Sequence, residues 1–196
     1  MVKIAIIFHS KYGHTEQQAK AVLAGAECVQ NIEARLIAVD KFQENIDFVN
    51  ESDAIIFGSP TYMWTISAEF KVFMDATSKI WFKQQWKDKL AAGFTNSGWP
   101  SGDKLNTMNQ MSIFAAQHGM IWISLGLIPG NLLHDPEKAE INRLGSFLGA
   151  MACSEFNQKP ENSPPPCDLE TAKFLGERVA YSAVRWAAGK KDMSNV

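Results

Sequence analysis

The feature that most constrains the fold of this chain is an alternation between two spacings of apolar residues, one typical of strands and one typical of helices. Residues 2–8 form a nearly continuous, β-branched apolar run, which is typical of a strand buried on both faces. Residues 14–27 then change to a helical period. The change recurs, with strand patterns at 32–39, 53–57, 90–94 and 120–124 and helical patterns at 67–80, 103–117 and 168–188. This alternation predicts an α/β fold with a five-stranded parallel sheet and helices on both faces.

The pattern loosens after residue 125. Residues 126–144 contain Pro-Gly-Asn and Asp-Pro sequences and are predicted to be mostly loop. Residues 147–152 can resume the fifth strand, and residues 157–166 form a second long loop rich in proline and serine. Loops of this length are usually functional or lie at an interface. We expect one domain over residues 1–190 and a frayed polar tail over 191–196.

Composition excludes several classes of protein. Nineteen Lys and Arg against twenty-one Asp and Glu give a net charge of −2, which does not suit a nucleic-acid binder. The three cysteines, Cys28, Cys153 and Cys167, include no C-x-x-C pair, so neither a disulfide framework nor a metal site is expected. Residues 105–133 carry no formal charge, but Gln-His-Gly interrupts them at 117–119, so no membrane span is expected. Without a signal peptide, a cytoplasmic location is expected.

The loop between the first strand and the first helix predicts an anion site. Free N–H groups and the helix dipole favour negative charge at a helix N-terminus. Ser10 and Thr15 add hydroxyl donors, and Gly13 allows close approach of the backbone. The loop lacks both G-K-[ST] and G-x-G-x-x-G, so a single phosphate ester fits best, and an ordinary capped turn is the alternative. The candidate residues are Ser10, Lys11, Tyr12, Gly13, His14 and Thr15.

Two further loops directly follow the third and fourth predicted strands. One offers hydroxyl and flat aromatic groups, and the other offers small residues with free N–H groups, although each alone could be an ordinary turn. In a sheet of order 2-1-3-4-5, strands one, three and four are adjacent. Their carboxyl ends share the crevice where FMN binds in flavodoxin-like folds. The candidate ring contacts are Pro60, Thr61, Tyr62, Met63, Trp64, Thr95, Asn96, Ser97, Gly98, Trp99 and Pro100.

These motifs resemble those of the WrbA family of NAD(P)H:quinone oxidoreductases, within the flavodoxin-like superfamily. The resemblance covers roughly residues 2 to 188. The matching sequences are SKYGHT at 10–15, GSPT at 58–61, FKVFMD at 70–75 with Trp81 after it, TNSG at 95–98 and HGM at 118–120.

The resemblance implies an FMN-dependent, two-electron reductase that is usually a homotetramer, with a dimer as the alternative. NADH or NADPH would be the donor, and a quinone or similar small molecule the acceptor. FMN phosphate would lie on residues 10–15, and the ring against residues 61–63 and 95–100. His118 would lie near the ring and assist proton transfer, or else be an ordinary helix-terminus histidine. Tyr12 would help bind the nicotinamide nucleotide, and Trp81 would line the substrate side, reaching the flavin of a neighbouring subunit.

Two loops depart from the family pattern. The family's second loop is usually of the Arg-Phe-Gly-Asn type, whereas residues 62–65 here are Tyr-Met-Trp-Thr. Its third loop is rich in glycine, whereas Trp99 and Pro100 stand here. Both changes add bulk near the expected ring and bear on quinone access and nucleotide preference more than on FMN binding.

The cofactor would carry the chemistry, with the protein supplying placement and local charge. If donor and acceptor use one face of the ring, they must alternate, which predicts ping-pong kinetics. Two alternatives stay open. One is a flavodoxin-type electron carrier, although flavodoxins are usually strongly acidic and this chain has a net charge of only −2. The other is a flavin-binding regulatory protein without turnover.

Overall fold

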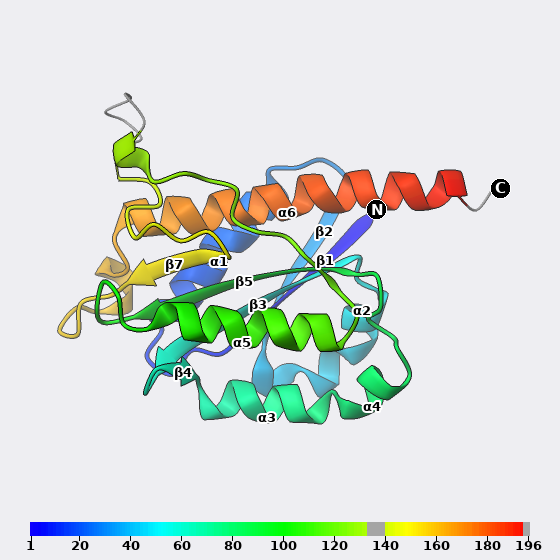
Figure 1. Ribbon diagram of the computed structural model, residues 1–196, viewed down its shortest axis with the longest axis horizontal. Helices are drawn as coiled ribbons and strands as arrows, with labels where there is room; N and C mark the ends of the chain where they lie inside the picture. Colours follow the sequence, from blue (N-terminus) through cyan, green and yellow to red (C-terminus); the bar gives the residue numbers. More distant parts are fainter. Residues whose placement is uncertain (133–139, 194–196) are drawn as a thin grey trace.

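The computed structural model describes residues 1–132 and 140–193 and shows a central sheet between two layers of helices (Figure 1). The strand order is β2-β1-β3-β5-β6, with β7 also paired to β5. The strands are β1 (Val2–Phe8), β2 (Ile32–Ala38), β3 (Ala54–Tyr62), β4 (Thr65–Ile66), β5 (Leu90–Ser97), β6 (Ile121–Trp122) and β7 (Ala150–Cys153). The helices are α1 (His14–Glu27), α2 (Ile46–Glu51), α3 (Ala68–Ala76), α4 (Ser78–Phe82), α5 (Lys104–Gln117) and α6 (Pro166–Met193).

The predicted sheet order 2-1-3-4-5 is confirmed, with a fifth strand in two pieces. β6 pairs in parallel with the start of β5, where Ile121 lies beside Leu90. β7 pairs in parallel with the end of β5, where Ala150 lies beside Phe94. Of the residues between these two pieces, the described ones, 123–132 and 140–149, lie outside the sheet. The predicted return of the fifth strand near residues 147–152 is therefore confirmed, with its bounds at Ala150–Cys153.

Alternate residues of each central strand pack into two separate cores. Ile4 and Ile6 of β1 face the layer made by α1 and α6, whereas Ala5 and Ile7 face the opposite layer. This second layer contains α3 and α5, and it holds the fully buried Trp86. Because the sheet is covered on both faces, its strands read as continuous apolar runs in the sequence.

Helices α1 and α6 touch through glycine. A Cβ on Gly25 would lie 1.9 Å from the carbonyl oxygen of Lys173, and a Cβ on Gly176 would lie 1.9 Å from that of Val22. Since real Cβ atoms cannot approach a carbonyl so closely, the two backbones can only pack at this distance with glycine at both positions. The contact holds α1 firmly against α6, and α1 begins at the predicted anion site.

Several predicted bounds were wrong. β3 and β5 extend through residues that the sequence assigned to loops, because Ser59 and Pro60 continue the ladder beside Thr95 and Asn96. The predicted helix over 67–80 is two helices, α3 and α4, separated at Thr77. Helix α2 and the short strand β4 were not predicted. Helix α6 continues to Met193, into the predicted tail, and residues 194–196 lie outside the described residues.

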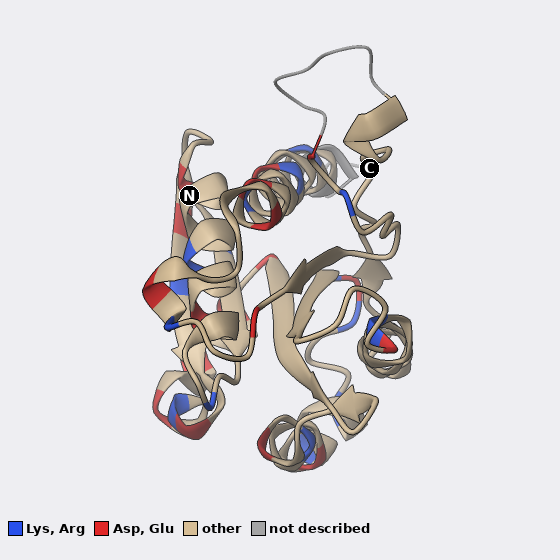
Figure 2. Ribbon diagram, turned by 90° about the vertical axis from the view of Figure 1, so that its left-hand side faces the viewer, with Lys and Arg blue, Asp and Glu red and all other residues tan. Residues whose placement is uncertain are grey.

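Acidic and basic residues lie interspersed, mainly on the helices and loops around the sheet (Figure 2). Within the described ranges, no helix is both long enough and apolar enough to cross a membrane.

Candidate functional site

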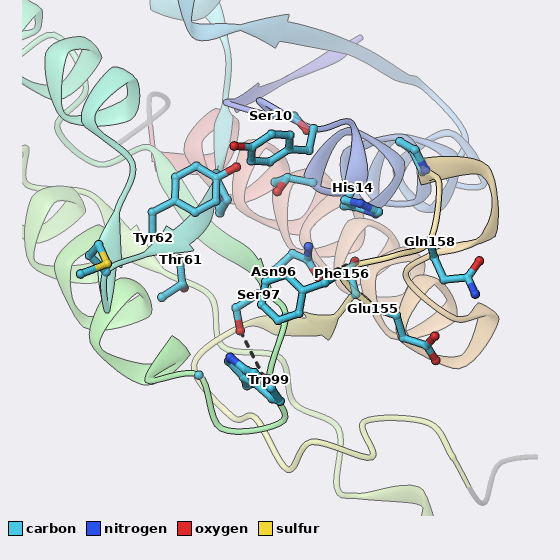
Figure 3. Close-up of a pocket in the computed structure, with 18 of the residues that line it drawn as sticks. Ser10, His14, Thr61, Tyr62, Asn96, Ser97, Trp99, Glu155, Phe156 and Gln158 are labelled. Atoms are coloured by element: carbon cyan, nitrogen blue, oxygen red, sulfur yellow. Dashed lines mark hydrogen bonds between the residues drawn. The ribbon is translucent and has the colours of Figure 1, made fainter.

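A cavity of about 830 Å³ opens at the carboxyl edge of the sheet, a size usual for cofactor and ligand pockets (Figure 3). The segments after β1, β3, β5 and β7 surround it. This is the edge at which ligands bind in open α/β sheets. Its lining residues are Ser10, Tyr12, His14, Thr15, Pro60, Thr61, Tyr62, Met63, Trp64, Asn96, Ser97, Gly98, Trp99, Gly102, Ser154, Glu155, Phe156, Gln158, Lys159 and Pro160.

One end of the cavity is the N-terminus of α1. Gly13 precedes the helix in the left-handed conformation, with φ at 87°. As a glycine it has no side chain that could cap the helix. The hydroxyl oxygen of Ser10 accepts a hydrogen bond from the Glu16 N–H at 3.1 Å, and its own proton is free to turn toward a ligand. A Cβ on Gly13 would lie 2.6 Å from Cγ of Pro160, so the loop and the opposite wall are in close contact. The result is a narrow end with N–H donors, suited to an anion.

A fourth segment, residues 154–160, closes the cavity and is tied to its neighbours. The Ser154 N–H donates to the Ser97 carbonyl oxygen at 2.9 Å, and the Ser154 hydroxyl donates to Oδ1 of Asn96 at 3.0 Å. From α1, Nδ1 of His14 donates to the carbonyl oxygen of Ser163 at 2.9 Å, and the Ser163 hydroxyl oxygen accepts from the Glu155 N–H of the segment at 3.1 Å. These bonds fix the segment over both the anion end and the third predicted loop.

The second predicted loop is a tight hairpin between β3 and β4. Tyr62 pairs with Thr65, and the two residues between them, Met63 and Trp64, have φ angles of 45° and 67°. Positive φ at both central residues is the geometry of a type I′ turn, which usually contains asparagine or glycine. Bulky residues in such a conformation are uncommon and point to a function for their side chains. Both side chains are exposed at the cavity mouth.

Tyr62 contributes a flat, neutral face to the cavity. Its ring meets that of Tyr12 edge to face, with centroids 6.2 Å apart. Burial raises the pKa of Tyr62 to about 12, so the phenol stays protonated at neutral pH.

Three threonine hydroxyls support this wall from behind. Oγ1 of Thr61 lies 2.9 Å from that of Thr95 and 2.8 Å from that of Thr107 on α5. Thr95 is fully buried and does not line the cavity. Thr95 therefore lies behind Thr61 and holds it in place, and its predicted contact with a ligand stays a prediction.

The rim opposite the hairpin is aromatic. Trp99 and Phe156 meet edge to face with centroids 5.4 Å apart, and both are largely exposed (Figure 3). A Cβ on Gly98 would lie 2.4 Å from Cζ of Phe156, so glycine is needed for this contact. Together with Trp64, these rings line the entrance of the cavity. They therefore restrict entry to molecules that can pass between flat aromatic walls.

Most of the predicted contacts come together, and a few do not. Lys11 faces a neighbouring cavity of about 630 Å³, which also contacts Tyr12, Tyr62 and Met63. Gly13 and Pro100 shape their loops without lining the larger cavity. Seven lining residues were not among the predicted contacts, although the loop over 157–166 was expected to be functional or to lie at an interface: Gly102, Ser154, Glu155, Phe156, Gln158, Lys159 and Pro160. The return of the fifth strand near residue 150 was the available signal, since a loop after that strand must reach the same edge.

His118 does not line the cavity of its own chain, and its predicted position near a bound ring stays a prediction. His118 directly follows α5, which begins at the cavity edge and runs for 14 residues, so it lies roughly 20 Å away at the other edge of the sheet. It is buried between Trp86 and Phe114, with ring centroids at 4.6 and 4.8 Å. The Thr77 hydroxyl donates to Met74, so Nε2 of His118 donates to the Thr77 oxygen at 3.0 Å.

The surroundings of His118 predict a pH dependence of stability. Nδ1 is buried without a partner among the described residues, and burial lowers the pKa of His118 to about 4. Between that value and an unfolded pKa of about 6.5, the unfolded chain binds a proton that the folded chain does not. Stability is therefore complete above pH 6.5 and falls with decreasing pH. We expect a loss of about 2 kcal/mol between pH 7 and pH 5 from this residue.

Urea unfolding of the wild type and of His118→Phe at both pH values measures this loss. The variant should show a drop smaller by about that amount. Equal drops for both proteins would contradict the assignment.

Trp81 lies on the short helix α4 and does not line the cavity of its own chain. Its side chain is partly exposed. The implied role in the site of a neighbouring subunit stays a prediction.

Residues 10–128 match the model of the family described as NADPH-dependent FMN reductase. The chain belongs to this family. The match includes the anion end, the hairpin and the third loop, and it supports FMN as the bound cofactor and NAD(P)H as the donor.

Individual relatives agree with the resemblance to WrbA proteins. The crystal structure of a flavodoxin, WrbA-like protein from Agrobacterium tumefaciens is 38% identical, with a TM-score of 0.74 over 94% of this chain and 99% of that chain. Flavodoxin FldP of Pseudomonas aeruginosa is 40% identical over 92% of this chain and 96% of its own length. An NAD(P)H dehydrogenase (quinone) of Archaeoglobus fulgidus is 32% identical over 93% of this chain and 98% of its own length. The resemblance and the flavodoxin-like fold are confirmed.

The residues present fit FMN. The N-terminus of α1, where Gly13 supplies no capping side chain, provides the N–H donors that a phosphate monoester needs, and the close contact at Gly13 leaves that end narrow. The wide end has flat aromatic faces at Tyr62 and Trp99 and amide groups at Asn96. A planar, heterocyclic ring with polar edges matches such walls.

Proposed function

We propose that this cavity holds FMN and that the protein transfers two electrons from NADH or NADPH to a quinone or similar acceptor by a ping-pong mechanism. The observation that carries the proposal is one cavity with the N-terminus of α1 at its narrow end and an aromatic rim at its wide end. Family membership and a relative named NAD(P)H dehydrogenase (quinone) support it.

The chain's own residues would bind and orient the cofactor. The N–H groups of residues 11–15, with the hydroxyl of Ser10, would hold the phosphate. Tyr62 and Trp99 would flank the ring, and Asn96 would face its polar edge. When bound, FMN supplies the hydride and electron chemistry, and the protein supplies placement and exclusion of water.

Donor and acceptor would both enter between the hairpin and the Trp99–Phe156 rim. A shared entrance would make the two molecules alternate, which gives ping-pong kinetics. Tyr12 lines both cavities, so it would contact the nicotinamide nucleotide as it enters.

We also propose that the protein works as a homotetramer or dimer in the cytoplasm. Large apolar side chains stand exposed on three helices of one layer, at Val72 of α3, Phe82 of α4 and Ile113 of α5. A second copy on this layer would cover them. Trp81 lies beside Phe82, as a residue shared between subunits would require.

A second candidate function is that of an FMN-dependent electron carrier without turnover of its own. The name of the 40% identical relative, flavodoxin FldP, favours it. The two candidates differ in whether a nicotinamide nucleotide reduces the flavin.

An anaerobic titration of the FMN-loaded protein separates them. NADPH and NADH are added in turn while the flavin absorbance is followed, and benzoquinone is then added. Reductase function predicts stoichiometric bleaching by at least one nucleotide and full recovery with the quinone. FMN that stays oxidised with both nucleotides would contradict the reductase and leave the carrier.

A further inference from the structure

A buried lysine lies behind the part of the cavity wall that the third predicted loop forms, and it was not among the predicted ligand contacts. Lys104 is the first residue of α5 and has no exposed surface. Its ammonium donates to Oγ of Ser97 at 2.9 Å and to the carbonyl oxygen of Trp99. Ser97 and Trp99 both line the cavity, so the ammonium lies directly behind the wall.

The loop is folded tightly around this group. Ser97 Oγ also donates to the Trp99 carbonyl oxygen at 3.2 Å, the bond drawn in Figure 3. Gly102 has φ at 53°, and a Cβ there would lie 2.2 Å from Ser97 Oγ. Within this packing Lys104 is fully buried.

Among the described residues, the one buried carboxylate that acts on Lys104 already has another partner. The charged groups that face it are Asp168 and Arg143, together with the thiol of Cys153. Asp168 is already paired with Arg143 through two bonds of 2.8 Å, so the three charges sum to one positive charge. Burial lowers the pKa of Lys104, whereas the carboxylate of Asp168 opposes that shift.

The helix dipole adds to this field. The N-terminus of α5 is itself positive, and a cation in the first turn is unfavourable for the helix. Lysine at this position therefore costs stability. The charge and the dipole act together on whatever lies against Ser97 and Trp99.

We propose that Lys104 stabilises negative charge on the flavin ring and so favours reduced over oxidised FMN. The inference rests on the proposed function, in which the ring lies against this wall. FMN that has taken up two electrons and one proton carries a negative charge on its ring, whereas the oxidised ring is neutral. A positive charge in a wall of low dielectric constant acts on the first form only. Lys104 is thus a positioning residue for Ser97 and Trp99 and an electrostatic one for the ring.

Lys104→Gln tests the charge while keeping a side chain that donates hydrogen bonds. Its exposed counterpart, Lys173→Gln on α6, is the matched control. Dissociation constants of oxidised FMN and of dithionite-reduced FMN are measured for each protein. We expect Lys104→Gln to weaken reduced FMN about tenfold more than oxidised FMN, which corresponds to a midpoint potential lower by about 30 mV for two electrons. Lys173→Gln should leave the ratio unchanged.

An unchanged ratio of the two dissociation constants would overturn the proposal. If both forms bind more weakly by the same factor, Lys104 has a structural role only. If Lys104→Gln does not fold, the wild type decides. Its dithionite-reduced FMN, followed by absorbance against pH, should stay anionic at a pH at which free reduced FMN is half protonated. Protonation at the same pH as free FMN would overturn the proposal. The proposed turnover can fail while these binding results hold, and it can hold while they fail.

Discussion

Replacement of Gly13 by alanine is expected to weaken FMN binding at least about tenfold, or 1.4 kcal/mol. The backbone strain of a non-glycine residue at φ 87°, about 1 kcal/mol, lowers stability with or without FMN. The new Cβ would also lie 2.6 Å from Cγ of Pro160, a rigid ring, so the anion end and the opposite wall must separate. Isothermal titration of the apoprotein with FMN measures the change.

Gly145 offers a matched control for the backbone strain. Its φ is 66°, and the nearest atom to a new Cβ is Cγ of Pro129 at 3.9 Å. Gly145→Ala should therefore lower stability by a similar amount, about 1 kcal/mol, and leave FMN affinity unchanged. If both variants bind FMN equally well, the contact between Gly13 and Pro160 does not shape the phosphate end.

Replacement of Gly176 by alanine is expected to lower the free energy of unfolding by about 3 kcal/mol or more. The added methyl group would lie 1.9 Å from the Val22 carbonyl oxygen and 3.1 Å from the Ala26 nitrogen. These are backbone atoms, so relief requires α1 and α6 to move apart and to open the core that they share. Urea unfolding of the apoprotein gives the difference directly.

The control position for Gly176 lies on the same helix, α6. A Cβ on Gly189 of α6 would meet no atom within 4 Å. Gly189→Ala should be neutral or stabilising by up to about 1 kcal/mol, since alanine favours a helix more than glycine does. Destabilisation of similar size at both positions would mean that helix contact is not the reason for glycine at 176.

The sheet order could be predicted from the sequence because buried parallel strands leave long apolar runs. The bounds near the site could not, for a physical reason. Residues 58–61 have the composition of a turn, yet Ser59 and Pro60 continue β3, since pairing with β5 outweighs their local preference. The hairpin after them places Met63 and Trp64 at positive φ, which no sequence pattern indicates.

The site, too, could be predicted only in part from the sequence. Segments that start directly after an apolar strand could be assigned to the crevice, as for residues 10–15. His118 could not be placed, because its position depends on the length and direction of α5 and not on its motif. The burial of Lys104 could not be predicted either, since a lysine at the start of a helix usually stands in solvent. The structure shows instead that its ammonium is bonded to Ser97 and Trp99.

The most direct test of the central claim is a comparison of FMN with riboflavin. The apoprotein is titrated with each while flavin fluorescence is followed. We predict quenching of FMN with an end point at one molecule per chain, and binding of riboflavin, which lacks the phosphate, weaker by at least about tenfold. Equal affinity for the two flavins, or no quenching by either, would contradict a site with the phosphate on α1 and the ring against the aromatic walls.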